Sequence, residues 1–176
     1  MRERYRTIAR VVKAHGRRGE VVTVSVHDLP SLVREGLEVA VLPPELLGPR
    51  WRTVTSCGSD DRGGQLVGLS GVGDIASAEG LVGKYLLARR SDLPDDLNLH
   101  DPRALLGREV VDGRLGALGT IDEVMRGPAN DVWVVRGELG ETLLPVVDAV
   151  VGMPPDEGPI PVRVPAGLEP SGGGDR

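Results

Sequence analysis

Apolar and polar residues alternate over short stretches of this chain, and turns rich in glycine and proline separate the stretches. Clear examples are residues 7–12, 21–27, 37–42 and 50–57. A period of two is typical of strands with one buried face, and the valines that dominate these stretches favour strands as well. The pattern predicts one short helix over residues 74–82, with Asp74 placed to cap its first turn and Gly83 placed to end it.

The same kind of pattern resumes after residue 103 and predicts a second set of strands. Residues 142–147 and 149–153 are apolar at nearly every position, which indicates strands buried on both faces, whereas Pro161 suggests an edge strand over 159–164. Many short strands with regular turns predict a mainly β protein built of small barrels. We therefore expect a barrel over 1–90, a linker over 91–102, a second barrel over 103–170 and a disordered tail over 171–176.

Composition and charge add a functional asymmetry to this picture. The 176 residues include no phenylalanine, two tyrosines and two tryptophans, so valine, leucine, isoleucine and alanine must build the cores. Residues 1–90 carry 14 lysines and arginines against 10 aspartates and glutamates, whereas residues 91–176 carry 7 against 16. A basic half suits nucleic acid, and an acidic half suits a basic protein.

A glycine-bounded loop is the strongest candidate for a binding site. Gly16 and Gly19 enclose Arg17 and Arg18 just before the valine-rich strand. Because glycine permits a positive φ, this spacing predicts a tight turn that carries the two arginines. The candidate nucleic-acid-binding residues are Lys13, His15, Gly16, Arg17, Arg18 and Gly19. Cations on a compact tip are placed to contact the phosphate oxygens of a nucleic acid.

An enzymatic alternative depends on the segment Gly71-Val72-Gly73-Asp74-Ile75-Ala76, which matches the glycine fingerprint of dinucleotide-binding proteins. This alternative makes the chain a nucleotide- or dinucleotide-binding enzyme. However, Asp74 would place a carboxylate beside the pyrophosphate, and no second strand–helix–strand unit follows. The three histidines are isolated, and Cys57 is the single cysteine, so the sequence predicts no catalytic residues, no metal site and no cofactor.

Several short motifs, in order, resemble the RimM family of ribosome maturation factors. They begin with Val11-Val12-Lys13-Ala14-His15-Gly16-Arg17-Arg18-Gly19-Glu20-Val21 and continue with the segment from Asp74 to Lys84. In the second half they are Leu105-Leu106-Gly107, Asp112-Gly113, Ala129-Asn130-Asp131-Val132, Leu143-Leu144-Pro145-Val146-Val147 and Pro165-Ala166-Gly167-Leu168. The resemblance implies an N-terminal six-stranded barrel of the translation-factor type and a C-terminal PRC barrel.

The resemblance also implies a function and partners. It implies a non-enzymatic assembly factor that binds ribosomal protein S-nineteen and pre-rRNA while the head of the 30S subunit matures. The single cysteine and the lack of a signal peptide or long apolar span predict a cytoplasmic protein with no membrane partner, and we expect a monomer. Family members carry an aromatic pair before the second barrel, but His100 and Asp101 occupy that place here. The candidate protein-binding residues are therefore Leu99, His100, Asp101 and Leu105, with the two leucines as apolar anchors.

Overall fold

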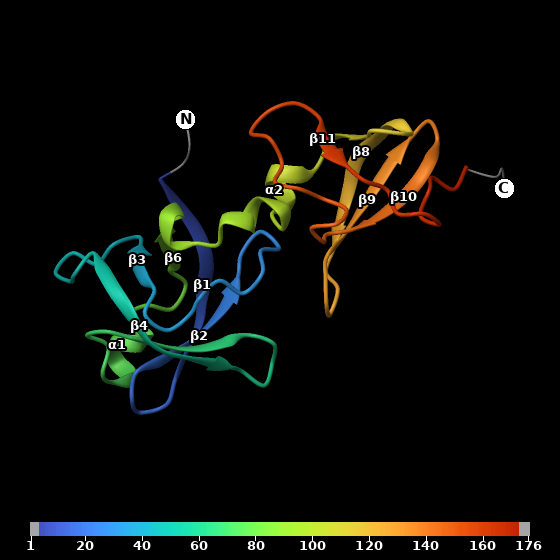
Figure 1. Ribbon diagram of the computed structural model, residues 1–176. Coiled ribbons are helices and arrows are strands. Elements are labelled where there is room, and N and C mark those ends of the chain that lie inside the picture. The colour runs from blue at the N-terminus through green and yellow to red at the C-terminus, as the bar shows by residue number, and fades with distance from the viewer. Residues whose placement is uncertain (1–3, 173–176) are drawn as a thin grey trace. The chain divides into compact units, whose positions relative to one another are not determined.

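The computed structural model describes residues 4–172 of the chain, and the chain divides into two compact units between Asp95 and Asp96. Both units are built mainly of strands with a few short helices (Figure 1). The predicted mainly β class is therefore confirmed. Over the described residues, no helix is long and apolar enough to cross a membrane.

Unit 1 is a closed barrel of six antiparallel strands. In chain order they are β1 (Tyr5–His15), β2 (Glu20–Ser25), β3 (Glu38–Leu42), β4 (Trp51–Ser59), β5 (Gln65–Leu69) and β6 (Tyr85–Arg89). Their order around the barrel is β1-β2-β5-β4-β3-β6, so β6 pairs with β1 and closes the sheet. Aliphatic residues such as Ile8, Val39 and Leu86 face inward and have no exposed surface. Closure leaves the barrel without an unpaired edge strand.

A single short helix, α1 (Ile75–Glu79), lies between β5 and β6. It spans only part of the predicted segment 74–82. Asp74 caps it as expected, because its carboxylate accepts a hydrogen bond of 2.7 Å from the Ser77 amide. The helix ends earlier than predicted. A tight turn follows it, in which the Leu81 amide donates a hydrogen bond of 3.0 Å to the Ala78 carbonyl.

Unit 2 contains a five-stranded sheet. Its strands are β7 (Glu109–Asp112), β8 (Gly116–Met125), β9 (Val132–Gly137), β10 (Gly140–Pro145) and β11 (Ile160–Val162), in the spatial order β10-β9-β8-β7-β11. Strand β11 pairs with β7 in parallel and lies at the edge of the sheet, as Pro161 suggested. The prediction of a strand over residues 149–153 is wrong. That segment forms a turn, and only Val151 makes an isolated bridge, to Val162.

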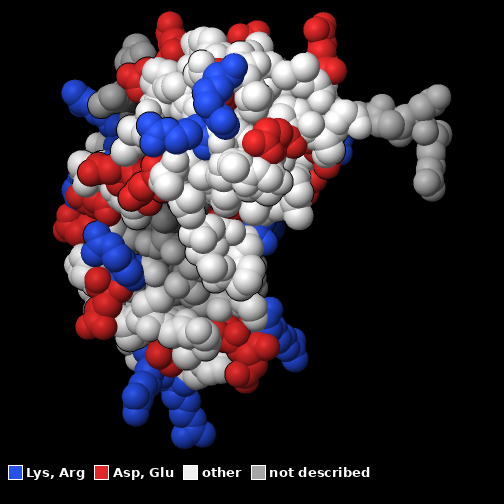
Figure 2. Space-filling model, turned by 45° about the vertical axis from the view of Figure 1, so that its right-hand side comes forward, with Lys and Arg blue, Asp and Glu red and all other residues white. Residues whose placement is uncertain are grey.

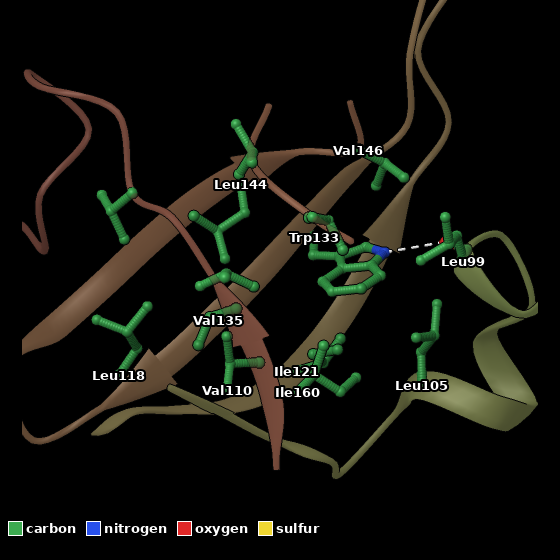
Figure 3. Packing of buried hydrophobic residues seen from close by; sticks show 14 residues of the cluster. Leu99, Leu105, Val110, Leu118, Ile121, Trp133, Val135, Leu144, Val146 and Ile160 are labelled. Carbon is green, nitrogen blue, oxygen red and sulfur yellow. Dashed lines mark hydrogen bonds between the residues drawn. The ribbon is translucent and has the colours of Figure 1, made fainter. Parts of the chain in front are cut away.

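The core of unit 2 is organised around Trp133, which has no exposed surface (Figure 3). Leucine, valine and isoleucine side chains from all five strands and from the segment before β7 pack around its ring. The Trp133 indole N–H donates a hydrogen bond of 3.1 Å to the Leu99 carbonyl. This bond satisfies a polar group that would otherwise be buried without a partner.

The segment expected to be an open linker is structured. It contains the 3-10 helices η1 (Arg90–Asp92) and η2 (Asp95–Leu99) and the short helix α2 (Pro102–Leu105). Leu97 and Leu99 of η2 are buried, and Leu99 belongs to the core cluster of unit 2. Of the expected tail, Ser171 pairs with Glu141, and residues 173–176 lie outside the described residues.

The exposed stretch 94–96 gives a test of the division into two units. The endoproteinase Asp-N cuts before aspartate, and Asp95 and Asp96 are both exposed at the division. We expect limited digestion of the folded chain to release two fragments that each keep a strand-rich circular dichroism spectrum. If a cut at this position unfolds either fragment, the two units do not fold independently.

Buried Asp112 gives a test of how unit 2 is stabilised. Its carboxylate accepts hydrogen bonds from the amides of Val164, Arg114 and Leu115 at 2.7, 2.7 and 3.0 Å. These bonds, the one from Val164 first, hold the pKa of Asp112 below its ordinary value. Because the folded pKa is depressed, the stabilisation is complete above the unfolded pKa of about 4 and is lost as the pH falls through the folded pKa.

We expect Asp112→Asn to lower the free energy of unfolding of unit 2 by about 1–3 kcal/mol at neutral pH, because the amide group cannot accept all three bonds. Chemical denaturation at several pH values measures this change. The acid-dependent part of the stability should shrink in the variant. Asp122→Asn is the matched control, since half-exposed Asp122 bonds only the exposed Arg136. Equal effects of the two substitutions would contradict the role given to Asp112.

Candidate functional site

The loop between β1 and β2 gathers the basic residues that the sequence singled out. We call the residues Lys13, His15, Gly16, Arg17, Arg18 and Gly19 the cationic turn. Gly16 and Gly19 adopt positive φ angles of 66° and 76°, which confirms the tight glycine-dependent geometry. The side chains of Lys13, His15, Arg17 and Arg18 are all exposed. The structure therefore brings the predicted cations together on one hairpin end.

No carboxylate among the described residues pairs with the cations of this turn, which leaves their charge available to a ligand. Figure 2 shows Lys and Arg side chains projecting at the lower end of the view, the height at which the β1–β2 loop lies in Figure 1. A fixed group of unpaired cations attracts a polyanion more strongly than cations that already pair with carboxylates. The arrangement suits phosphate binding.

Gly19 fixes the turn against another part of unit 1. A Cβ atom at Gly19 would lie 2.6 Å from the Asp74 amide nitrogen and 2.7 Å from the Asp74 carbonyl oxygen. Such distances are shorter than any van der Waals contact, so no side chain fits there. The cationic turn consequently rests on the residues that begin α1.

The structure around residues 71–76 argues against the alternative of a dinucleotide-binding enzyme. The segment 71–76 opens a helix of only five residues in an antiparallel barrel, not a long helix between parallel strands. Its amides face the Gly19 backbone and the Asp74 carboxylate, whose pKa is lowered mainly by the Ser77 amide. A pyrophosphate would meet this carboxylate and not open helix amides. The dinucleotide-binding site is therefore wrong.

The structure corrects the sequence-based choice of protein-binding residues in unit 2. Leu105 has no exposed surface, and Leu99 is 8% exposed, so neither is an apolar anchor on the surface. Asp101 is also buried, and its carboxylate caps α2 by accepting a 3.0 Å hydrogen bond from the Arg103 amide. Among the four residues, only His100 keeps substantial exposure, at 26% of its side chain.

A pocket of about 280 Å³ lies beside His100 within unit 2. It is lined by Asp96, Leu99, His100, Val146, Val147, Asp148, Val151, Gly152 and Met153. The floor is apolar, and the two aspartates are exposed. Sequence reasoning missed Met153, which is 62% exposed, because the apolar run up to this residue suggested a buried strand. An apolar floor with acidic neighbours suits a basic side chain with a long aliphatic stem.

A network of polar side chains holds His100 at this pocket. Its Nδ1 lies 2.7 Å from an Asp131 carboxylate oxygen, which also binds Arg126. Arg126 donates a second hydrogen bond of 2.5 Å to the His100 carbonyl. Charge-assisted bonds of this kind fix an orientation, and no serine, threonine, cysteine or lysine lies among the described residues of the network or the pocket. The network therefore holds His100 in one orientation at the pocket.

Among the described residues, no three histidine, cysteine, aspartate or glutamate side chains are grouped so that they could hold a metal ion. Cys57 is partly buried, and desolvation followed by the charge of Glu35 raises the pKa of its thiol. A raised pKa disfavours the reactive thiolate.

Comparison with known proteins identifies both units. The family model described as the RimM N-terminal domain matches residues 6–93, and the model described as the RimM PRC barrel domain matches residues 102–157. These matches cover the closed barrel of unit 1 and strands β7 to β10 of unit 2. They confirm a RimM N-terminal domain followed by a PRC barrel domain, as the resemblance implied.

Whole-chain relatives agree with the domain matches. A ribosome maturation factor RimM from Pediococcus pentosaceus is 30% identical over 94% of this chain and 99% of its own length. Another from Rubrobacter xylanophilus is 37% identical over 78% of this chain and 80% of its own. The solution structure of the N-terminal domain of RimM from Thermus thermophilus is 25% identical over 52% of this chain and 96% of its own, with a TM-score of 0.42. From both domain matches and the whole-length relatives, this chain belongs to the ribosome maturation factor RimM family.

Proposed function

We propose that this protein is a cytoplasmic, monomeric and non-enzymatic assembly factor that promotes maturation of the head of the 30S subunit. In this proposal unit 1 binds pre-rRNA and unit 2 binds ribosomal protein S-nineteen. The observation that carries it is the cationic turn, four exposed basic side chains on a fixed hairpin with no paired carboxylate among the described residues. The relatives' common name, ribosome maturation factor, supports an rRNA-containing target.

The physical basis for rRNA binding is counterion release. Each phosphate that a lysine or arginine neutralises frees a condensed cation, and the affinity then falls as salt is added. Arg17 and Arg18 occupy the tip of the turn, whereas Lys13 lies before it on β1. Because backbone contacts carry no sequence information, this surface positions the protein on RNA without selecting a base sequence.

The basis for binding a ribosomal protein is the opposite charge of unit 2. Residues 96–176 carry 14 aspartates and glutamates against 7 lysines and arginines. In this proposal the pocket beside His100 provides the apolar contact with the partner that the sequence had assigned to Leu99 and Leu105. Met153 provides exposed apolar surface there, and Asp148 provides negative charge next to it. Apolar anchors usually dominate binding energy, and charges at the rim chiefly change the association rate.

Charge reversal in the cationic turn tests the rRNA assignment. We expect Arg17→Glu and Arg18→Glu together to weaken association with immature small subunits and to reduce the slope of log affinity against log salt by about 1.5. Co-sedimentation over a range of salt concentrations measures both quantities. Arg62→Glu is the matched control for the single reversal Arg17→Glu, because it makes the same change of charge outside the cationic turn. Arg62 lies in the β4–β5 turn, at the other end of β2 from the cationic turn. An unchanged slope in the double variant would show that these arginines only face solvent.

Two substitutions at the pocket test the assignment of the protein partner. We expect Met153→Ala to raise the dissociation rate from purified S-nineteen by roughly fivefold or more, since it removes apolar contact area. We expect Asp148→Lys to slow association, because it reverses a charge at the rim. Surface plasmon resonance with the full chain measures both rates. Leu139→Ala is the control, because Leu139 is similarly exposed but does not line the pocket. The assignment fails if S-nineteen does not bind, or if Leu139→Ala has the same effect as Met153→Ala.

A further inference from the structure

Three of the four aromatic residues of this chain lie on one outer wall of the unit 1 barrel. Tyr5 is on β1, Trp51 begins β4 and Tyr85 begins β6, whereas the fourth aromatic residue, Trp133, is in the core of unit 2. Strands β1, β6, β3 and β4 are consecutive neighbours in the barrel. Since unit 1 builds its core from aliphatic residues, its aromatic residues are not needed there.

The strand registers show how this wall is laid out. Tyr85 lies opposite both Arg10 of β1 and Leu42 of β3, and Tyr5 lies opposite Arg89 of β6. Successive side chains of a strand alternate between the two faces, which gives the outward set. We call this set the aromatic face: Tyr5, Thr7 and Arg10 of β1, Tyr85, Leu87 and Arg89 of β6, Glu38, Ala40 and Leu42 of β3, and Trp51 and Thr53 of β4.

Arginine side chains already stack on the rings of this face. The Arg89 guanidinium carbon lies 4.0 Å from the centre of the Trp51 ring, and the Tyr5 ring is 5.9 Å from the same ring. Arg10 lies 5.8 Å from the centre of the Tyr85 ring. Tyr5 and Tyr85 remain 46% and 39% exposed, so each ring keeps accessible surface. Planar guanidinium groups and aromatic rings are the surfaces on which unpaired bases stack.

The charge of the face favours a nucleic acid over a protein as its occupant. Glu38 is the one carboxylate among the residues of the aromatic face, and Arg89 already binds it at 2.5 Å. Arg10 pairs with no carboxylate of the described residues, and it lies on the same strand as Lys13. Strand β1 therefore joins the face to the cationic turn through a row of basic residues. This continuity matches a strand whose phosphates follow β1 while its bases turn toward the face.

We infer that the aromatic face binds unpaired bases of single-stranded rRNA by stacking, and that it thereby selects unfolded over base-paired RNA. This inference rests on the proposed function and adds a second contact to it. Tyr5 lies opposite Arg89, which is four positions from Tyr85 along β6, a separation of about 13 Å. One base cannot contact both rings, so the face holds at least two bases. Bases inside a duplex present no free ring face to either tyrosine.

The fluorescence of Trp51 can report binding at the aromatic face. Of the two tryptophans in the chain, Trp51 is partly exposed, whereas Trp133 has no exposed surface. The full chain is titrated with ten-nucleotide oligoadenylate, with an RNA duplex of the same length and with inorganic polyphosphate. We expect tryptophan fluorescence to change with oligoadenylate and to change little with the other two. Equal changes with the duplex or with polyphosphate would overturn selection of unpaired bases.

Ring substitutions separate stacking from charge. We expect Tyr85→Leu to weaken oligoadenylate binding at least fivefold and to leave its salt slope unchanged, because the lost ring carries no charge. Tyr85→Phe keeps the ring and should stay within twofold of the unchanged protein. Arg10→Lys keeps the charge but loses the planar group, so it should also weaken binding. Circular dichroism verifies that the variants keep the barrel fold, since Tyr85 is a surface residue.

The remaining outcomes distinguish this inference from the proposed function. If Tyr85→Leu binds oligoadenylate as the unchanged protein does while the Arg17 and Arg18 reversals weaken subunit binding, stacking is wrong and the proposed function stands. If neither set of variants affects RNA or subunit binding, both are wrong. If Tyr85→Leu weakens co-sedimentation with immature subunits but not oligoadenylate binding, the face contacts a protein, and the inference is overturned.

Discussion

Several features of unit 2 meet at one hydrogen bond, which the Trp133 indole donates to the Leu99 carbonyl. It ties the 3-10 helix before the sheet to the largest side chain of the core, at a distance of 3.1 Å. His100 follows Leu99 directly, and Asp131 lies two residues before Trp133, so this bond brings the two ends of the His100–Asp131 contact together. The position of the pocket depends on the same bond, because Leu99 and His100 line it. In a core without phenylalanine, one indole thus determines both packing and the shape of a surface.

The two units handle charge in different ways. In unit 1 no carboxylate of residues 4–172 pairs with the exposed cations of the turn, which keeps their attraction for a polyanion but adds little to stability. In unit 2 the polar groups around His100 form a network, with Arg126 bound to Asp131 and to the His100 carbonyl. Unpaired charge favours rapid, salt-sensitive encounter, whereas a bonded network favours a fixed contact geometry. Both properties suit the assembly factor proposed above, which would have to find a large target and then hold it in one orientation.

The sequence predicted the parts of this fold that depend on local periodicity. Alternating valines located the strands of unit 1, and Gly16 and Gly19 located the turn, because both signals act between near neighbours. It failed for Leu99 and Leu105, because they are buried by packing into a core cluster with residues distant in the sequence, such as Trp133, which no local pattern shows. The aromatic face was also beyond reach, since Tyr5, Trp51 and Tyr85 meet only through the barrel's strand order. The pocket is formed partly by turns after β10, where the apolar residues 149–153 had suggested a strand instead.

The close approach of Gly19 to Asp74 has a consequence for the order in which this protein becomes competent during its own synthesis. The hairpin that carries the basic tip is made early, but the backbone on which Gly19 rests follows 55 residues later along the chain. Strand β6, which closes the barrel against β1, follows later still. Until those residues emerge, the nascent tip has the right charges but no support for its shape. The basic tip of a growing chain therefore lacks its final geometry until unit 1 is complete.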